Sequence, residues 1–399
     1  MSADSADAVE VQGEGVWNEV LGQPAAVRAL RRALDRDELA HAWLVVGPPA
    51  VGQQELVRAL AAALNCPQPV AADLGCATCT TCRRTAQGRH TALLELEPKG
   101  AGYLVDDVRS EWMPAAMHSL TEGRRKVLRV RRADRMNEAA QNAFLKVLEE
   151  PPASVVWVLE VEDEGALLDT VVSRCRRLDL VPWGLEPLRC RAMELDIPVE
   201  RREALARAAL GSPSRLEALA DVEVAAARER HLGVIDRLAT AGPGVVVPLA
   251  KELHTWTKGR SAVVKESNAA ELARLEEEFG VDDRGRGWPP GLRNQLKRKH
   301  ERTERQAQRA ALDLLLDDLA SYLRDLVTVA SGGGTGELVN LDAEVALRRD
   351  AERLPVPDAI RALSAVAHCR AALDRNGNPE LQLERLLLQL ALPIYAASA

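Results

Sequence analysis

The chain has 399 residues, of which 47% are hydrophobic and 28% are charged, and its formal net charge is −7. This length predicts two or three domains, and the composition is that of an ordinary soluble globular protein. The acidic balance argues against a nucleic-acid binder of the basic-domain type, and no apolar run is long enough to predict a membrane span. Residues 1–14 lack the features of a signal peptide and predict a disordered polar tail, so we expect a cytoplasmic protein.

An apolar run at 42–46 predicts a buried strand, and the turn after it has the spacing of a phosphate-binding loop. Gly47 and Gly52 occupy the two glycine positions of G-x-x-x-x-G-K-[S/T]. Gln53 stands where a lysine would reach the β- and γ-phosphates, and Gln54 stands where a hydroxyl would hold Mg²⁺. A neutral amide replaces neither group well. Glycines at this spacing also occur in plain strand-to-helix turns, so this turn alone leaves both interpretations open.

Four of the seven cysteines lie close together and predict a metal site. Their spacing is C-x9-C-x2-C-x2-C, and they are Cys66, Cys76, Cys79 and Cys82. Zinc prefers four soft ligands at tetrahedral corners, and a site with four protein ligands and no open position is structural rather than catalytic. Disulfides fit a reducing cytoplasm poorly, and four reduced bystander cysteines are the alternative. Arg83 and Arg84 follow the cluster and would offset the negative charge of a zinc tetrathiolate.

A strand, a helix and a second strand are predicted after the cysteines. Residues 125–130 have β-like apolar content, and Asn137 suits the N-cap of a helix. Apolar residues then repeat at helical spacing until Pro151-Pro152 ends the helix. Residues 155–159 form another apolar run, so the alternation predicts a parallel sheet with helices on its faces.

Taken together, these segments resemble the AAA+ subunits of bacterial clamp loaders, which belong to the DNA polymerase III holoenzyme. The resemblance covers residues 16 to 220 and is most specific in residues 145–152, Leu-Lys-Val-Leu-Glu-Glu-Pro-Pro, and in Ser173-Arg174-Cys175. It implies an α/β AAA+ module, with a parallel sheet, flanking helices, an inserted zinc module and a small helical lid, followed by an all-α collar domain. The implied parts are an AAA+ nucleotide-binding-like domain at 15–182 with a zinc insert at 66–82, a lid at 183–222 and a collar or oligomerisation domain at 223–399.

Departures from the family's pattern indicate which kind of subunit the chain resembles. In ATP-hydrolysing members, the strand that matches residues 127–130 runs into an acidic pair that binds Mg²⁺ and orients water. Here those two positions are Arg131 and Arg132, whose charges would repel the metal. Because Gln53 and Gln54 also replace the lysine and the hydroxyl, the resemblance favours a non-hydrolysing subunit with a vestigial P-loop and weak or absent ATP binding.

The same resemblance implies a role for Arg174. In this family the arginine of the Ser-Arg-Cys segment projects toward the γ-phosphate of a neighbouring subunit, so Arg174, flanked by Ser173 and Cys175, would be an arginine finger in trans. Such a guanidinium can contribute roughly 10³–10⁵ in rate. Without the family context, an arginine that caps or pairs at the end of a strand is the favoured interpretation. Arg215 stands where the family's lid places a sensor arginine, and a salt bridge at a helix start is its alternative.

The C-terminal half predicts a helical bundle. A leucine-rich stripe runs from residue 312 to 327, and a last helix is expected at 378–392, stopped by Pro393. A basic stretch at 258–306 is either a solvated helix face or a DNA contact. Four leucines make the last helix apolar almost all round, which predicts that it is buried, within the chain or against a neighbour: Leu386, Leu387, Leu388 and Leu390.

The function that the resemblance implies is that of a non-hydrolysing clamp-loader subunit. It would support the ATP-dependent loading of the sliding clamp onto primed DNA in chromosome replication. Its expected partners are the ATPase motor subunits, the delta subunit and, through the complex, the clamp and primed DNA. We expect no activity of the isolated chain, although the holoenzyme is a DNA-directed DNA polymerase. The alternatives are an ATP-hydrolysing motor subunit of the gamma or tau type and a zinc-dependent DNA-binding regulator.

Overall fold

The computed structural model describes residues 15–68, 75–98, 102–279, 287–288 and 292–398. The predicted disordered tail at 1–14 lies outside the described residues. The chain divides into two compact units, one up to Glu217 and one from Ala218 onward. In the part of the chain that the structure describes, no helix is both long and apolar enough to cross a membrane. The finer boundaries of the lid and the collar stay a prediction.

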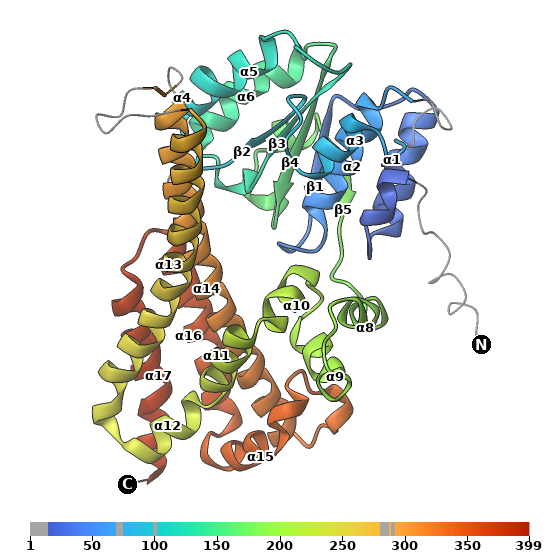
Figure 1. The fold of residues 1–399 in the computed structure, drawn as a ribbon. Coiled ribbons are helices and arrows are strands. Elements are labelled where there is room, and N and C mark those ends of the chain that lie inside the picture. The colour runs from blue at the N-terminus through green and yellow to red at the C-terminus, as the bar shows by residue number, and fades with distance from the viewer. Residues whose placement is uncertain (1–14, 69–74, 99–101, 280–286, 289–291, 399) are drawn as a thin grey trace, which may run out of the picture. The chain divides into compact units, whose positions relative to one another are not determined.

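Five parallel strands form the centre of the first unit (Figure 1). In chain order they are β1 (Ala42–Val46), β2 (Leu93–Leu96), β3 (Lys126–Val130), β4 (Val155–Val161) and β5 (Arg176–Asp179). Their order in the sheet is β2-β3-β4-β1-β5, so β1 lies between β4 and β5. The strands expected at 42–46, 125–130 and 155–159 and the parallel sheet are confirmed.

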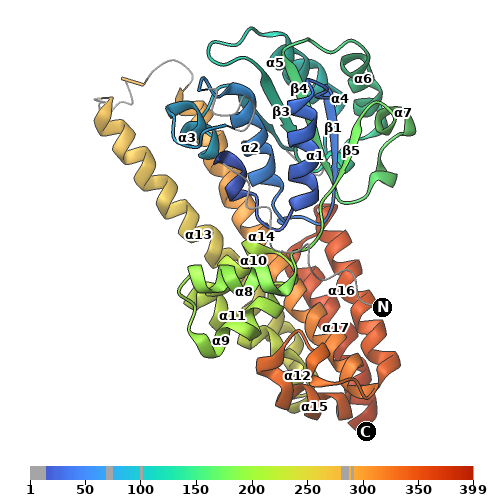
Figure 2. The same cartoon turned by 90° about the vertical axis from the view of Figure 1, so that its right-hand side faces the viewer.

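Helices cover both faces of this sheet (Figures 1 and 2). The connection from β1 to β2 crosses the sheet in the direction opposite to those from β2 to β3 and from β3 to β4. Because parallel connections are right-handed, the helices of the two directions lie on opposite faces. One face carries α1 (Pro24–Asp35), α2 (Gln53–Asn65) and α3 (Thr80–Ala86), and the other carries α5 (Met113–Met117) and α6 (Glu138–Glu149). The unit also contains α4 (Val105–Asp107), a π-helical turn (Val108–Trp112), α7 (Asp169–Val172), α8 (Leu185–Glu194), α9 (Val199–Ala208) and the start of α10 (Pro213–Ala220).

Aromatic side chains fill the space between the sheet and α6. Phe144 of α6, Trp157 of β4 and Trp112 are almost completely buried. The ring centroids of Phe144 and Trp157 lie 4.9 Å apart with the planes at 81°, and those of Trp112 and Phe144 lie 5.5 Å apart at 87°. These edge-to-face contacts fix the position of α6 on the sheet, and α6 carries the Glu-Glu-Pro-Pro segment at its end.

The predicted limits of α6 are confirmed at both ends. The side chain of Asn137 accepts a hydrogen bond from the backbone N–H of Ala140 at 2.8 Å, so Asn137 is the N-cap. The helix ends at Glu149, two residues before Pro151, whose ring cannot continue it. Glu149 is therefore held in the last turn of a well-anchored helix.

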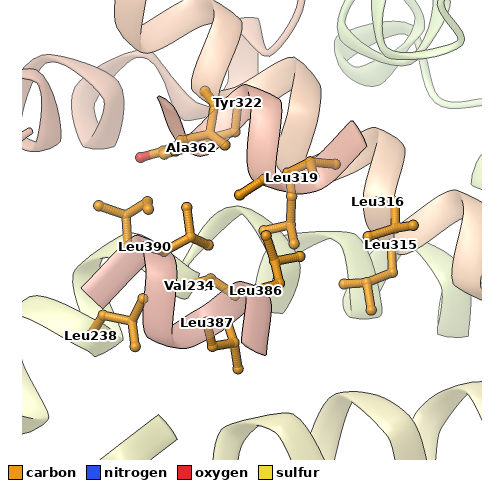
Figure 3. Packing of buried hydrophobic residues seen from close by; sticks show 14 of the residues in the cluster. Val234, Leu238, Leu315, Leu316, Leu319, Tyr322, Ala362, Leu386, Leu387 and Leu390 are labelled. Carbon is orange, nitrogen blue, oxygen red and sulfur yellow. The ribbon is translucent and has the colours of Figure 1, made fainter. Parts of the chain in front are cut away.

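In its described residues the second unit contains helices and no strand, as predicted (Figure 1). Its leucine-rich core contains Leu315 and Leu319 on the predicted stripe, with Leu386 and Leu390 near the C-terminus and Val234, all labelled in Figure 3. Burial of apolar side chains stabilises such a bundle by about 25 cal/mol per Å². Its helices are α11 (Val222–Leu232), α12 (Val234–Ala241), α13 (Val246–Glu278), α14 (Leu292–Ala330), α15 (Glu344–Arg353), α16 (Val356–Asp374) and α17 (Pro379–Ser398).

One expectation for the last helix was wrong. Pro393 does not stop the helix but lies inside α17, which continues to Ser398. An internal proline costs about 3 kcal/mol, and burial of Leu390 and Ile394 on either side offsets this cost at roughly 1.5–3 kcal/mol each. Leu388 is 51% exposed in the chain, on the side of α17 away from the bundle core, so its burial against a neighbour stays a prediction. Leu386, Leu387 and Leu390 are buried as predicted.

The basic stretch at 258–306 falls on α13 and the first half of α14, and part of it lies outside the described residues. The two helices pack against each other, and Lys299 Nζ lies 3.0 Å from Glu271 Oε1 across the pair. Their contacts here include polar ones, for example Asn268 Nδ2 donating to Thr303 Oγ1 at 3.2 Å. These pairings fit a solvated helix face, and a contact with DNA stays a hypothesis.

Candidate functional site

The turn at residues 47–54 joins β1 to α2, so the predicted strand, turn and helix are confirmed. Gly52 precedes the first residue of α2 with φ of 118°, a conformation that strains residues with a side chain. The turn thus lies at the carboxyl end of a parallel strand and at a helix N-terminus, where phosphate-binding loops occur.

Gln53, at the lysine position of the motif, folds its side chain back onto the turn. Its Oε1 accepts a hydrogen bond from the backbone N–H of Val51 at 3.0 Å, and its Nε2 donates to the carbonyl oxygen of Pro48. The side chain is buried. The Val51 N–H of the loop is therefore already bonded within the chain, and the position that would supply a cation supplies a neutral amide.

Three side chains from other parts of the first unit hold the turn in place. Gln23 Nε2 donates to the carbonyl oxygen of Val51 at 2.8 Å, and Trp183 Nε1 donates to the same oxygen at 3.0 Å. Ser212 Oγ donates to the carbonyl oxygen of Ala50 at 2.9 Å. None of these three contacts was predicted from the sequence, because each side chain is distant in sequence from its partner.

We expect Gln23→Ala to lower the free energy of unfolding by about 1–3 kcal/mol, the cost of unpaired buried polar groups. Besides Val51, the Gln23 amide bonds both backbone groups of Val181, at 2.6 Å to the carbonyl and 3.2 Å to the N–H. Urea unfolding measures the effect. Gln54→Ala is the matched control, because Gln54 is partly exposed and has no side-chain hydrogen bond in the described structure. Equal effects of the two substitutions would contradict this role of Gln23.

Arg131 and Arg132 directly follow β3, at the same carboxyl edge of the sheet as the turn. Arg131 Nη1 pairs with Glu97, and Arg132 Nη2 lies 4.0 Å from Glu162 Oε1. A guanidinium has no lone pair to offer a metal ion. Arg131 and Arg132 therefore place cations, each beside a carboxylate, where ATP-hydrolysing members of the resembled family have metal ligands.

The four cysteines predicted to bind zinc are brought together around the start of α3. The Sγ atoms of Cys66, Cys76, Cys79 and Cys82 all lie within 4.8 Å of one another. Two of these Sγ pairs, Cys66–Cys79 and Cys76–Cys82, are 4.0 Å apart. Tetrahedral zinc with Zn–S bonds of about 2.3 Å requires Sγ separations of roughly 3.8 Å. The donor set therefore fits a four-coordinate structural zinc site.

Backbone groups around the cluster favour thiolates. The N–H of Cys79 donates to Cys76 Sγ at 3.2 Å, and the N–H of Cys82 donates to Cys79 Sγ at 3.3 Å. Hydrogen bonding by the Thr78 side chain, with further backbone bonds, lowers the pKa of Cys76 to about 6, whereas burial raises the pKa of Cys82. Arg84, expected to offset the cluster's charge, pairs with Glu122 at 2.8 Å.

Arg174 lies between α7 and β5, near the amino end of a strand that runs parallel to β1. The 47–54 turn follows the carboxyl end of β1, so the two features lie at opposite edges of the sheet. With about 3.3 Å per residue, a five-residue strand separates these edges by roughly 16 Å. Arg174 Nη2 donates to Glu149 Oε1 at 2.7 Å and Nη1 donates to the carbonyl oxygen of Thr170 at 2.9 Å. The structure does not bring Arg174 to the chain's own turn.

The residues flanking Arg174 and the second predicted arginine have structural contacts. Ser173 Oγ donates to the carbonyl oxygen of Thr170 at 3.3 Å, and burial raises the pKa of the Cys175 thiol to about 12. Arg215 is buried, and its Nε donates to the carbonyl oxygen of Ala208 at the end of α9 at 2.7 Å. Arg215, on α10, therefore helps to pack α10 against α9.

The sheet order, the strand-to-helix turn and the C-terminal helical unit define an AAA+-like chain. Two sequence families match it: DNA polymerase III, delta subunit, over residues 22–183, and DNA polymerase III, delta subunit, C terminal, over residues 305–391. The chain belongs to the DNA polymerase III clamp-loader family.

Curated relatives include subunits of two kinds. The chain is 36% identical to DNA polymerase III subunit delta' of Pseudomonas aeruginosa over 45% of this chain and 55% of that protein. It is 29% identical to subunit delta' of Bacillus subtilis over 48% and 57%, and 32% identical to subunit tau of Escherichia coli over 52% and 33%. The match spans between a third and three fifths of the length of these relatives. Identity alone therefore does not separate the two kinds of subunit.

Solved structures resemble this chain only weakly. A DNA polymerase III gamma subunit-related protein of Thermotoga maritima is 18% identical, covers 92% of this chain and 99% of its own, and has a TM-score of 0.43. The Bacillus subtilis DNA clamp loader delta protein is 11% identical with the same coverage and a TM-score of 0.34.

Proposed function

We propose that this chain is a non-hydrolysing clamp-loader subunit of the delta-prime type. The observation that carries the proposal is the Gln53 side chain, which stands at the lysine position and bonds the loop to itself through Pro48 and Val51. A triphosphate would meet a loop whose Val51 N–H is already bonded and which has no ammonium group. Arg131 and Arg132 add positive charge where Mg²⁺ would need carboxylates.

The placement of Arg174 supports a role in trans. The residue lies at the sheet edge opposite its own turn, and its side chain is 37% exposed. A surface guanidinium at that edge is accessible to the nucleotide of an adjacent subunit. Stabilising charge on a γ-phosphate needs only positioning and a cation, so a subunit without ATPase activity can still accelerate its neighbour's hydrolysis.

The proposed partners are the ATPase motor subunits and the delta subunit, with the sliding clamp and primed DNA reached through the complex. The second unit supports an assembly role, because leucines recur on the outer side of α17 at spacings of seven and four residues. They are Leu381, Leu388 and Leu392, exposed by 59%, 51% and 66%. Such a stripe is suited to packing against a helix of another subunit. Zinc at the four cysteines would stabilise the segment between α2 and α3.

Calorimetric titration of the isolated chain with ATP and Mg²⁺ tests the proposal. We expect no binding of micromolar or tighter affinity and no ATP turnover, because the lysine, the hydroxyl and the acidic pair are all replaced. A purified ATPase subunit of the same clamp loader, titrated alongside, is the positive control. The chain should nevertheless join the ATPase and delta subunits in a complex on size-exclusion chromatography.

The rival function is an ATP-hydrolysing motor subunit, which the match to subunit tau of Escherichia coli brings into consideration. Micromolar ATP binding or turnover by the isolated chain would favour this rival and overturn the non-hydrolysing proposal. Binding of DNA by the chain alone, in the absence of other subunits, would instead favour a DNA-binding regulator.

A further inference from the structure

Arg174 does not stand free at the surface but is held by two acceptors of its own chain. The carboxylate of Glu149 lies 2.7 Å from Nη2, and the carbonyl oxygen of Thr170 lies 2.9 Å from Nη1. Glu149 comes from the last turn of α6, and Thr170 comes from α7. One guanidinium is thus held between two helices that are themselves fixed on the sheet.

We propose that Glu149 is a positioning residue for Arg174, which it orients toward the phosphate of a neighbouring subunit; this rests on the proposed function of Arg174. A guanidinium has five N–H donors. Glu149 and Thr170 each take one, so three donors remain for phosphoryl oxygens. Glu149 can therefore hold Arg174 while Arg174 binds phosphate, and the two contacts do not compete for the same hydrogen atoms.

The energetic argument concerns conformational freedom. A free arginine side chain has several rotatable bonds, and ordering it on a ligand is costly. An acceptor within the subunit orders the side chain before the neighbour's nucleotide arrives, which lowers the entropic cost in the transition state. Glu149 is well placed for this, because α6 is packed by Phe144 against Trp157 and Pro151 prevents the helix from continuing. As an exposed pair, Arg174 and Glu149 contribute little to folding stability.

The experiment measures steady-state ATP hydrolysis by the reconstituted complex, with clamp and primed DNA present. The difference in hydrolysis rate between the unmodified complex and Arg174→Ala is the part of the rate that depends on Arg174. Glu149→Ala should reduce that part about two- to tenfold, the range expected for one side chain left unordered. The effect should fall on kcat, and KM for ATP should stay unchanged, because the neighbour binds ATP with its own loop. Glu149→Gln keeps an acceptor oxygen and should recover part of the rate.

Two controls make the result specific. Glu150→Ala should leave the rate unchanged, because Glu150 is also an exposed carboxylate, next in the chain, and its side chain has no partner in the described structure. The double variant Arg174→Ala/Glu149→Ala should be no slower than Arg174→Ala, since Glu149 acts only through Arg174. An unchanged or raised rate in Glu149→Ala, or an additive double variant, would overturn the positioning role. No loss in Arg174→Ala would instead refute the proposed finger itself.

Discussion

Cys79→Ser should release zinc from the purified protein and unfold the segment from Cys66 to Cys82. Structural zinc sites have apparent binding free energies of roughly 10–16 kcal/mol, which is free energy of local folding when the site is absent from the unfolded chain. Here the cluster joins the end of α2 to the start of α3. Its loss should therefore expose this part of the chain to proteases while the sheet keeps its stability.

Metal analysis and limited proteolysis of the reduced protein measure the two effects. Cys190→Ser is the matched control, because Cys190 is exposed on α8 and does not belong to the cluster. It should retain one zinc per chain and the proteolysis pattern of the unmodified protein. Reduced protein without stoichiometric zinc would refute the metal site. The four cysteines would then be reduced bystanders that bind no metal.

Arg174→Ala should slow ATP hydrolysis by the reconstituted clamp loader without disturbing its assembly. The affected site should lose up to roughly 10³–10⁵ in rate. The total rate should fall only by the fraction contributed by that site, and clamp loading should slow with it. Folding should be unaffected, because a surface ion pair contributes only about 0–1 kcal/mol.

Arg174→Lys should not restore the rate, since a lysine keeps the charge but lacks the planar fork of donors. Arg177→Ala is the matched control, because Arg177 is an exposed arginine three residues along that also pairs with carboxylates. It should assemble and hydrolyse ATP like the unmodified complex. If Arg174→Ala hydrolyses ATP at the unmodified rate in a fully assembled complex, Arg174 is only a surface ion pair.

Several elements of the first unit could be predicted from local sequence patterns. Long apolar runs identified β1, β3 and β4, and the N-cap and prolines bounded α6, because these signals do not depend on distant residues. β5 was not predicted, because its four residues are Arg, Arg, Leu and Asp and form no apolar run. An edge strand needs only one face buried and one neighbour, so its sequence is free to be charged.

The features that the sequence did not predict have a common physical origin. Gln23 and Trp183 reach Val51 from 28 and 132 residues away, and no periodic pattern encodes such a contact. Pro393 was read as a helix stop because local preference was weighed without the packing of Leu390 and Ile394. Replacements at motif positions, such as Gln53, were visible in the sequence. The two hydrogen bonds of the Gln53 amide could not be predicted, since both depend on the folded turn.

The polar contacts between α13 and α14 have a consequence for the motions of the second unit. Around Asn268 the two helices meet through amide, hydroxyl and carboxylate groups, whereas the part of α14 near Leu315 lies in the leucine core. Polar contacts contribute less net free energy than buried leucines, so the Asn268 region should open far more often than the core. In deuterated water, amides near Asn268 and His300 should exchange well before those near Leu315 and Leu319. The part of the α13–α14 pair around Asn268 would then be flexible, and the part in the leucine core would be rigid. The flexible part could change its angle without disrupting the packing of the bundle.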